Sequence, residues 1–299
     1  MEKFLVNKDD ENQRLDNYLA LNTDISRSKI QSLIKEEKIL VNNHLEKNSY
    51  LVRENDEITL EYVETENHLK PEKMDLDIVY EDNDIIVINK PNGLVVHPAP
   101  GNYEHTLANG LAYYSNSLSD INGEFRPGIV HRIDAYTTGL LVVAKNNKAH
   151  EVLALELAKK EVKRTYLALV WGVITEDSGT IDAPIGRDPS DRKKMAINPK
   201  GKEAVTHFKV LERFKKATLL EVYLDTGRTH QIRVHMDYIK HPIVNDPVYG
   251  KRELIDETGQ CLHAMKLELI HPTTKEKMEF TCDAPECFKN ILEKLKMEV

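Results

Sequence analysis

The feature that most constrains the fold of this 299-residue chain is a pair of apolar runs separated by a very short polar turn. The runs AVTHFKVLERF (204–214) and ATLLEVYLDT (217–226) are rich in Val, Thr and aromatic residues, as strands are. Strands joined by so short a connection must pair antiparallel, because a parallel pair requires a crossover of about a dozen residues or more. The chain therefore contains antiparallel sheet.

Other segments extend this pattern without a regular alternation of strand and helix. Further strands are predicted at 84–90, 139–145, 163–172, 264–272 and 277–283. Helical spacing predicts helices at 150–161, 229–241 and 286–298. More strands than helices, with short links between neighbours, are typical of an α+β fold. The sequence thus predicts a mixed, mainly antiparallel sheet covered by a few helices.

The N-terminal residues have the pattern of a small α/β unit of their own. RLDNYLAL and SRSKIQSLIKEEKI carry helical spacing, Asn42-Asn43 marks a tight turn, and DEITLEYV ends the unit as a strand. The polar segment after it contains Pro71 and has no periodicity. We predict a small module at 1–63, a linker at 64–75 and a larger domain at 76–299.

Charge is unevenly distributed along the chain. The net charge is −8, so the protein as a whole is not a general polyanion binder. Between Arg187 and Lys216, however, ten basic residues face four acidic ones, a local charge of +6. This segment, with Arg192, Lys193 and Lys194 at its centre, is typical of a localised nucleic-acid contact, although a solvated Lys-rich loop would have the same composition.

Several classes of protein are disfavoured by composition. Three cysteines without a CxxC spacing argue against a disulfide framework and against a zinc site. No apolar run approaches the roughly 20 residues that span a bilayer. The N-terminus lacks the apolar core of a signal peptide. We expect a cytoplasmic protein that does not associate with a membrane.

Ionisable residues stand in unusual places beside two predicted strands. GIVHRIDAYTTGLLVVAKN (128–146) places Asp134 just before a buried strand, and Arg228 stands at the start of a predicted helix. A cation there is disfavoured by about 0.3–1 kcal/mol, so a negative partner is expected, and Asp134 is the natural candidate. Such a pair would lower the pKa of an aspartate by about 1–3 units and keep it available as a nucleophile. A purely structural ion pair is the alternative.

The ordered motifs carry a resemblance. The chain contains NKPNGLVVHPAPG, GIVHRIDAYTTGLLVVAKN, KRTYLALVWG, PIGRDPSDRKKMAI, GKEAVTHFKV, TGRTHQIRVH and HPIVNDPVYG. In this order they resemble the RluA/RluD family of RNA pseudouridine synthases over residues 76–285. RLDNYL and SRSKIQSLI resemble the RNA-binding module named after a small-subunit ribosomal protein. The whole chain is therefore similar to the large-ribosomal-subunit pseudouridine synthase D type.

The resemblance implies a role for each matching residue. It makes Asp134 the catalytic nucleophile, Tyr166 the ring that stacks on the target base, and Arg228 the partner of Asp134. It further implies RNA contacts, which fall on Arg132, His131, Thr137 and Ile232 in the catalytic domain and on Arg27 and Lys29 in the module. No cofactor or metal is required, and the expected partner is ribosomal RNA bound by a monomer. The base must leave its stack before reaction, which requires a few kcal/mol.

Two features leave alternatives open. Ala135-Tyr136 replaces a basic-then-acidic pair that is usual in the family, which puts rate or substrate choice in doubt. An RNA glycosidase is disfavoured, because it would require two carboxylates where the motifs supply one. The same chemistry at another rRNA or tRNA site, or a non-catalytic RNA-binding ribosome-assembly factor, remains open.

Overall fold

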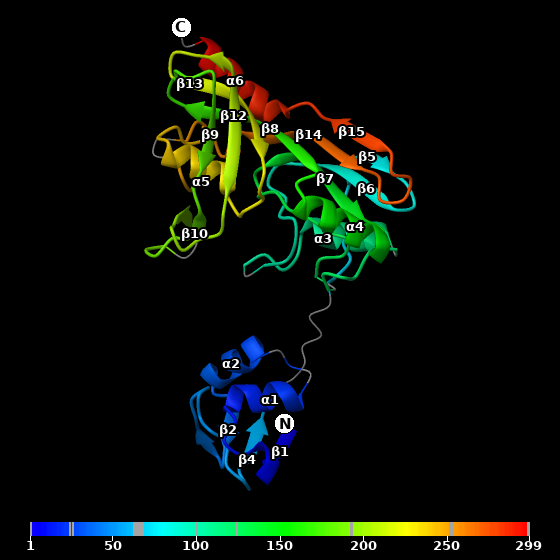
Figure 1. Ribbon diagram of the computed structural model, residues 1–299, viewed down its shortest axis with the longest axis vertical. Coiled ribbons are helices and arrows are strands. Elements are labelled where there is room, and N and C mark those ends of the chain that lie inside the picture. Colours follow the sequence, from blue (N-terminus) through cyan, green and yellow to red (C-terminus); the bar gives the residue numbers. More distant parts are fainter. Residues whose placement is uncertain are drawn as a thin grey trace. The chain divides into compact units, whose positions relative to one another are not determined.

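The chain folds as two compact units, Met1–Asn67 and His68–Val299 (Figure 1). The computed structural model describes residues 2–23, 25, 27–61, 69–99, 101–115, 117–123, 125–191, 194–250 and 254–297. Among the helices in these ranges, none combines the length and the apolar character that crossing a membrane requires.

The first unit packs two helices against a small antiparallel sheet. Its elements are β1 (Glu2–Leu5), a 3-10 helix (Lys8–Asp10), α1 (Leu15–Asn22), α2 (Arg27–Lys35), β2 (Ile39–Val41), β3 (His44–Leu45) and β4 (Glu57–Leu60). The strand order is β1-β4-β2-β3. Asn42 and Asn43 have φ angles of 50° and 64°, as a tight hairpin turn between β2 and β3 requires. The predicted helices and turn are present, and β1 is an additional strand.

The second unit is built on one large sheet. The strands of this unit are β5 (Ile78–Glu81), β6 (Ile85–Lys90), β7 (Thr138–Ala144), β8 (Lys163–Trp171), β9 (Ser178–Asp182), β10 (Ile185–Arg187), β11 (Met195–Ile197), β12 (Val205–Arg213), β13 (Ala217–Leu224), β14 (Leu262–Ile270) and β15 (Lys277–Thr281). Of these, β10 and β11 form a separate two-stranded sheet. Its helices are α3 (Leu107–Tyr114), α4 (Asn147–Ala158), α5 (Gln231–Tyr238) and α6 (Glu286–Met297).

The nine-stranded sheet has the order β5-β6-β7-β14-β8-β13-β12-β9, with β15 paired to β14. Its described pairs are antiparallel except β7 with β14, which is parallel. The prediction of a mixed, mainly antiparallel α+β fold is confirmed. The short β12–β13 turn indeed joins two antiparallel strands.

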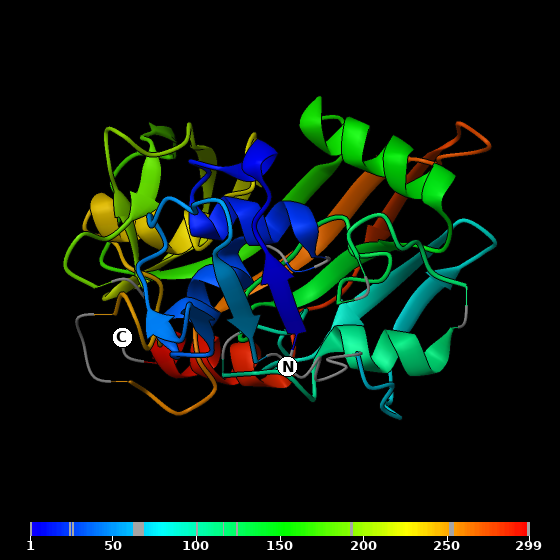
Figure 2. The ribbon, with the colours of Figure 1, turned by 90° about the horizontal axis from the view of Figure 1, so that it is seen from below.

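Helices cover both faces of the β6–β7 half of the sheet. Leu107 and Leu111 of α3 pack against the residues of β6 and β7 that point to one face of the sheet. Ala149 and Leu153 of α4 pack against the alternate residues of the same strands, which point to the other face. Figure 2 shows α3 and α4 on opposite sides of these strands. β7 is consequently buried along its whole length, which explains its continuous apolar run.

The start of the second unit includes part of the segment predicted as a linker. Leu69 is buried in the same core as Leu107 of α3. The backbone N–H of Glu72 donates to the carbonyl of Asn109, 3.0 Å away. Residues 62–68 lie outside the described residues. Residues 69–75 thus contact α3, a helix that the sequence did not predict.

Candidate active site

Asp134 lies in a loop that folds back along β7. Ile129 forms an antiparallel bridge with Val143, and the backbone N–H of Val142 donates to His131 Nε2 over 3.1 Å. The loop then closes in a tight turn, in which the N–H of Thr137 donates to the carbonyl of Asp134. This arrangement explains why ionisable residues precede a buried strand: the loop is held to the strand while Asp134 stands at its turn.

The parallel pairing of β7 with β14 requires a glycine at the foot of the loop. Gly139 has a φ of 103°, and a Cβ there would lie 2.3 Å from the carbonyl oxygen of Ala264. Ala264 is registered with Gly139 on one side and with Tyr166 of β8 on the other. β14 therefore brings Asp134 and Tyr166, which are far apart in the sequence, to one place.

Asp134 and Tyr166 line the same pocket. Its walls are formed by residues of the Asp134 loop, β8, the end of β13, the following loop, α5 and the start of β14: Arg132, Ile133, Asp134, Thr137, Arg164, Tyr166, Leu224, Gly227, Arg228, Thr229, His230, Gln231, Ile232, Arg233 and Leu262. Tyr166 is buried, and burial raises the pKa of its hydroxyl. Ile232 is also buried and adds an apolar wall. The pocket combines one carboxylate with an aromatic and aliphatic lining.

The arginine that contacts Asp134 is Arg233. Its Nη1 donates to Asp134 Oδ2 over 2.9 Å. The same guanidinium makes a bidentate pair with Asp246, from Nε over 2.7 Å and from Nη2 over 2.9 Å. Burial disfavours its charge, but the bonds to Asp246 and the charge of Asp134 prevail and raise the pKa of Arg233. Arg233 is therefore a fixed cation on α5.

The predicted ion pair between Arg228 and Asp134 is wrong. Arg228 Nε donates instead to the carbonyl of Glu203 over 2.8 Å. The reason is that α5 begins at Gln231, so Arg228 stands in the turn before the helix. Its backbone N–H donates to Gln231 Oε1 over 2.9 Å. Arg228 lines the pocket without ion-pairing to the carboxylate.

His230 is a second nitrogen-bearing side chain near Asp134. Its Nε2 lies 3.9 Å from Asp134 Oδ1. Its Nδ1 lies 2.8 Å from the hydroxyl of Tyr249, which itself accepts a hydrogen bond from the N–H of Met195. Burial lowers the pKa of His230, although the charge of Asp134 opposes this shift. A neutral His230 that presents Nε2–H to the carboxylate fits these contacts.

Lys90 fixes the backbone immediately after Asp134. It is fully buried at the end of β6. Its ammonium donates to three carbonyl oxygens, those of Pro91, Leu94 and Ala135, over 2.8, 2.9 and 2.7 Å. Burial lowers the pKa of Lys90 to about 7, and the charge of Asp134 opposes that shift. Three donors matched to three acceptors tie the NKPNGL turn to the Asp134 loop.

The other predicted contacts of the Asp134 loop occupy different positions. Arg132 is exposed at the mouth of the pocket, and its Nη1 donates to His97 Nε2 over 3.3 Å. Thr137 is buried, and its hydroxyl accepts a hydrogen bond from Gln260 over 3.2 Å. His131 is held by β7 and does not line the Asp134 pocket. The Thr137 hydroxyl therefore helps to hold the loop in place through Gln260, whereas the Arg132 side chain is accessible to a ligand.

The unusual Ala135-Tyr136 pair is accommodated by a glycine on another loop. Gly259 has a φ of 81°, and a Cβ there would lie 2.4 Å from Cγ of Tyr136. The Tyr136 ring therefore lies directly on the backbone of Gly259. Ala135 offers its carbonyl to Lys90, a contact that does not depend on its side chain. Neither Ala135 nor Tyr136 lines the Asp134 pocket.

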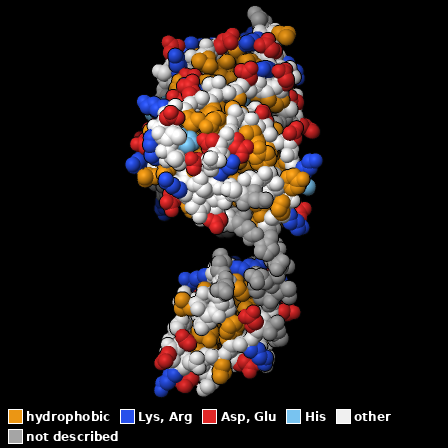
Figure 3. Space-filling model, turned by 90° about the vertical axis from the view of Figure 1, so that its right-hand side faces the viewer, with side chains coloured by type: hydrophobic (Ala, Val, Ile, Leu, Met, Phe, Trp, Pro, Cys, Tyr) orange, Lys and Arg blue, Asp and Glu red, His pale blue; other side chains and the backbone are white. Residues whose placement is uncertain are grey.

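In the first unit, the predicted RNA contacts lie on α2. Arg27 and Lys29 are exposed, and Figure 3 shows Lys and Arg side chains gathered along one edge of this unit. Arg27 Nε also forms an ion pair with buried Asp16, 3.2 Å away, which Arg14 shares at 3.0 Å. Arg27 thus has a structural partner as well as an exposed face.

The basic segment 187–216 is described only in part. Arg192 and Lys193 lie outside the described residues. The backbone N–H of Lys194 donates to the carbonyl of Asp191 over 2.9 Å. On the second unit, Figure 3 shows acidic and basic side chains interspersed over the visible face.

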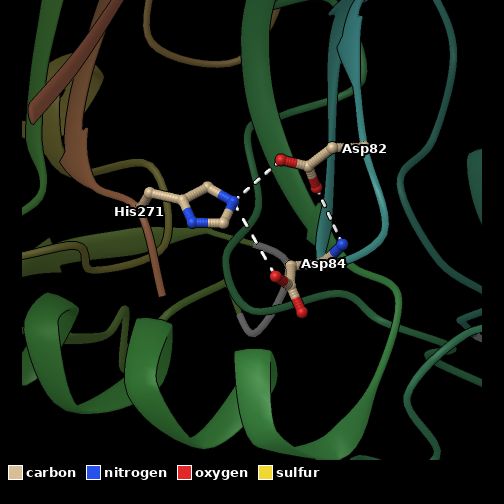
Figure 4. A group of neighbouring side chains, drawn as sticks. All are labelled: Asp82, Asp84 and His271. Carbon is tan, nitrogen blue, oxygen red and sulfur yellow. Dashed lines mark hydrogen bonds and ion pairs between the residues drawn. The ribbon is translucent and has the colours of Figure 1, made fainter. Parts of the chain in front are cut away.

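Of the described residues, Asp82, Asp84 and His271 form a group with metal-ligand atoms (Figure 4). His271 Nδ1 accepts hydrogen bonds from the N–H groups of Thr273 and Thr274. The proton therefore resides on Nε2, which donates to Asp82 Oδ2 over 2.8 Å. Neither imidazole nitrogen has a free lone pair for a metal, so the group ties the β5–β6 turn to the end of β14.

Arg233, Asp246, His230 and Lys90 are the site residues that sequence reasoning did not assign. A signal existed for Arg233, because it stands between Ile232 and Val234 in a helix and a charge among buried positions requires a partner. Asp246 in the motif HPIVNDPVYG is that partner. Lys90 carries no comparable signal, since its acceptors are backbone carbonyls.

Known proteins resemble this chain over most of its length. A family model described as RNA pseudouridylate synthase matches residues 84–238, and one described as S4 domain matches residues 13–58. An uncharacterized RNA pseudouridine synthase, YlyB, of Bacillus subtilis is 50% identical, over 97% of this chain and 97% of that protein. Ribosomal large subunit pseudouridine synthase D of Escherichia coli O157:H7 is 44% identical, over 96% of this chain and 91% of that protein. The solved structure of human RNA Pseudouridylate Synthase Domain Containing 1 matches with a TM-score of 0.57 and 29% identity, over 71% of this chain and 84% of that one.

Proposed function

Because this chain belongs to the RNA pseudouridylate synthase family, we propose that it isomerises uridines of large-subunit ribosomal RNA, with Asp134 as the catalytic residue. The ribosomal target is supported by the similarity to pseudouridine synthase D across 96% of the chain, both units included. RNA contact by the first unit is supported by its S4 match.

The observation that carries the proposal is that Asp134 is bound by Arg233 and is still accessible from the pocket. Its side chain is 16% exposed, open to the pocket, whereas Arg233 behind it is only 5% exposed. The arginine binds one carboxylate oxygen and leaves the other directed toward His230. A carboxylate that is paired with a guanidinium and still reachable can attack C1′ of a ribose or assist proton loss at C2′.

The pocket lining suits the rest of the reaction. The N1–C1′ bond of the flipped uridine breaks, the uracil turns, the C5–C1′ bond forms, and the C5 hydrogen leaves while N1 gains a proton. Tyr166 offers a stacking face, which is worth about 1–3 kcal/mol per base. Ile232 and Leu262 exclude water from the reacting carbon, which keeps the detached uracil from being lost to hydrolysis.

The test is Asp134→Asn in the full chain, acting on unmodified large-subunit rRNA whose uridines carry tritium at C5. We expect tritium release to fall by at least about three orders of magnitude, or about 4 kcal/mol of transition-state stabilisation. RNA affinity should stay within about twofold of wild type. Nucleotide-resolution mapping of pseudouridine identifies the target. Turnover near the wild-type rate would refute the assignment of Asp134.

The partner and the location of the reaction follow from the same proposal. We expect a cytoplasmic monomer whose basic segment 187–216 contacts RNA phosphates, so binding should weaken with salt. In the Asp134→Asn background, Lys194→Gln should reduce the salt slope of RNA binding, and an unchanged slope would leave that segment a solvated loop. A wild-type protein that binds ribosomal RNA and modifies no uridine in rRNA or tRNA would instead act as an assembly factor.

A further inference from the structure

A second cavity adjoins the Asp134 pocket. It measures about 370 Å³, within the range of small-molecule sites, whereas the Asp134 pocket measures about 70 Å³. Arg132, Arg164 and Gly227 line both. The remaining lining residues of the second cavity are His97, Asn122, Arg126, Ile129, Val130, His131, Leu157 and Ala158. In the whole described lining of the second cavity no residue is acidic, and Arg126, Arg132 and Arg164 are arginines.

Arg164 is the residue at the junction of the two cavities. It stands two positions before Tyr166 on β8, so both side chains leave the strand on the same face. Its guanidinium lies over Gly227, where an added Cβ would be 3.0 Å from Nη1. Gly227 thus leaves room for Arg164 to reach the opening between the cavities.

Arg164 has no partner among the described residues. No hydrogen bond or ion pair joins its guanidinium to a side chain or a carbonyl in the part of the chain that the structure describes, and its Nε is a buried donor without an acceptor. A partly buried cation left without a counter-charge is destabilising. Arg233, on the other side of the pocket, has two carboxylates. The contrast indicates that the counter-charge of Arg164 comes from a ligand.

His131 strengthens this indication. Its Nε2 accepts the hydrogen bond from Val142, so the proton resides on Nδ1, which is buried and finds no acceptor among the described residues. Burial lowers the pKa of His131 to about 3, and the positive charge of Arg164 adds to that effect. Two donors without acceptors therefore lie beside a cavity that carries positive charge and no described carboxylate.

We propose that the second cavity is a subsite for a backbone phosphate of the RNA, at the nucleotide next to the target uridine, and that Arg164 is its principal ligand. The proposal rests on the proposed function. A ribose positioned with C1′ against Asp134 carries phosphates on both its 3′ and 5′ sides, so one of them must leave the pocket through its mouth. Arg164 and exposed Arg132 stand where the pocket opens into the second cavity, and guanidinium groups bind phosphate oxygens in bidentate fashion.

The experiment uses the Asp134→Asn protein, so that binding is measured without turnover, and a short RNA that contains the target uridine. Arg164→Gln removes the proposed ligand. Lys163→Gln, one position earlier on β8 and exposed, removes the same charge from the other face. We expect Arg164→Gln to weaken binding about tenfold or more and to reduce the salt slope by about 1. Lys163→Gln should change affinity less than about twofold.

A methylphosphonate in place of one phosphate tests the contact directly. Neutralising the phosphate on one side of the target should weaken binding to the protein with Arg164, and should have little further effect on Arg164→Gln, because both changes remove the same contact. Losses that add at each flanking phosphate, or an Arg164→Gln protein that binds like Lys163→Gln, would overturn the proposal.

The same series separates this proposal from the one on which it rests. The proposed function fails if wild-type protein produces no pseudouridine in any RNA. The phosphate subsite fails if wild-type protein is active and Arg164→Gln lacks either the affinity loss or the non-additivity. Arg164→Lys retains the charge without the bidentate geometry, so it should recover the salt slope and only part of the affinity. A nonspecific structural effect of Arg164→Gln would leave the salt slope of Arg164→Lys reduced as well.

Discussion

Each unit of the protein holds an aspartate against arginine, and the two arrangements are inverted. In the first unit Asp16 is fully buried, and its partners Arg14 and Arg27 are 45% and 48% exposed in their side chains. In the second unit Arg233 is 5% exposed, and its partner Asp134 is 16% exposed toward the pocket. The same pair of groups thus buries the carboxylate in one place and the guanidinium in the other.

The inversion determines what each carboxylate can do. Asp16 accepts hydrogen bonds from Arg14, Arg27 and Gln31, so its oxygens are occupied and it joins α1 to α2. Asp134 has one oxygen bound to Arg233, whose charge is balanced separately by Asp246. Asp134 can therefore react, because Asp246 holds Arg233 in place and the second oxygen of Asp134 still faces the pocket.

The largest expected effect is that of Arg233→Gln. It leaves Asp246 buried without its bidentate partner, so the free energy of unfolding of the second unit should fall by about 3–5 kcal/mol. Trp171 is the only tryptophan in the chain and is buried in β8, so its fluorescence in a urea titration reports this unit.

Arg228→Gln is the matched control for that change. Arg228 belongs to the same motif, but its guanidinium donates to the carbonyl of Glu203. Its replacement should lower the free energy of unfolding by about 1 kcal/mol or less. Equal losses for the two arginines would mean that Arg233 is not the fixed cation of the site.

A smaller effect is expected from Asp16→Asn. Hydrogen-exchange protection of α1 and α2 in the full chain should fall by about 1–3 kcal/mol, because the carboxylate that joins them is gone. Bonds from Arg14 lower the pKa of Asp16, while burial partly opposes that shift. Its stabilisation is therefore present above the pKa of unfolded aspartate, about 4, and is lost as the pH falls below it.

The pH dependence supplies the control for Asp16→Asn. The difference in protection between wild type and the variant should shrink between about pH 5 and about pH 2. A difference that stays constant over this range would show that the stabilisation does not come from the ionised carboxylate.

The smallest effects are those of Arg27→Gln and Arg14→Gln. Each removes one half-exposed partner of Asp16, so each should change the stability of the first unit by less than about 1 kcal/mol. If the first turn of α2 contacts phosphate, Arg27→Gln should also weaken RNA binding and reduce its salt slope by about 1, whereas Arg14→Gln should not. Equal RNA affinities would assign Arg27 to the Asp16 cluster alone.

Local rules predicted the fold wherever partners are close in the chain. The short β12–β13 connection required antiparallel pairing, and Asn42-Asn43 required a turn. The parallel pair β7–β14 joins segments 125 residues apart through two registered positions, and no local pattern specifies it. That pair nevertheless positions Asp134 beside Tyr166.

The sequence predicted the carboxylate of the candidate site, Asp134, and its aromatic ring, Tyr166. It did not predict the cation, Arg233. Arg228 was chosen because a cation at a helix start needs a negative partner, yet the helix begins three residues later and Arg228 bonds to a carbonyl. The apolar neighbours Ile232 and Val234 indicate that Arg233 needs a partner, but they do not identify it. The partner is Asp246, which comes from a loop that the sequence pattern does not place against α5.

The contact between Tyr136 and Gly259 restricts the order in which this chain can change over evolutionary time. Any side chain added at 259 meets the Tyr136 ring, so a substitution there is admissible only after position 136 has become smaller. Even then the left-handed backbone at 259 favours Gly, Asn or Asp. A substitution of Tyr136 can come first, whereas a substitution of Gly259 cannot. Descendants of this sequence that have lost Gly259 should therefore also have a smaller residue at position 136.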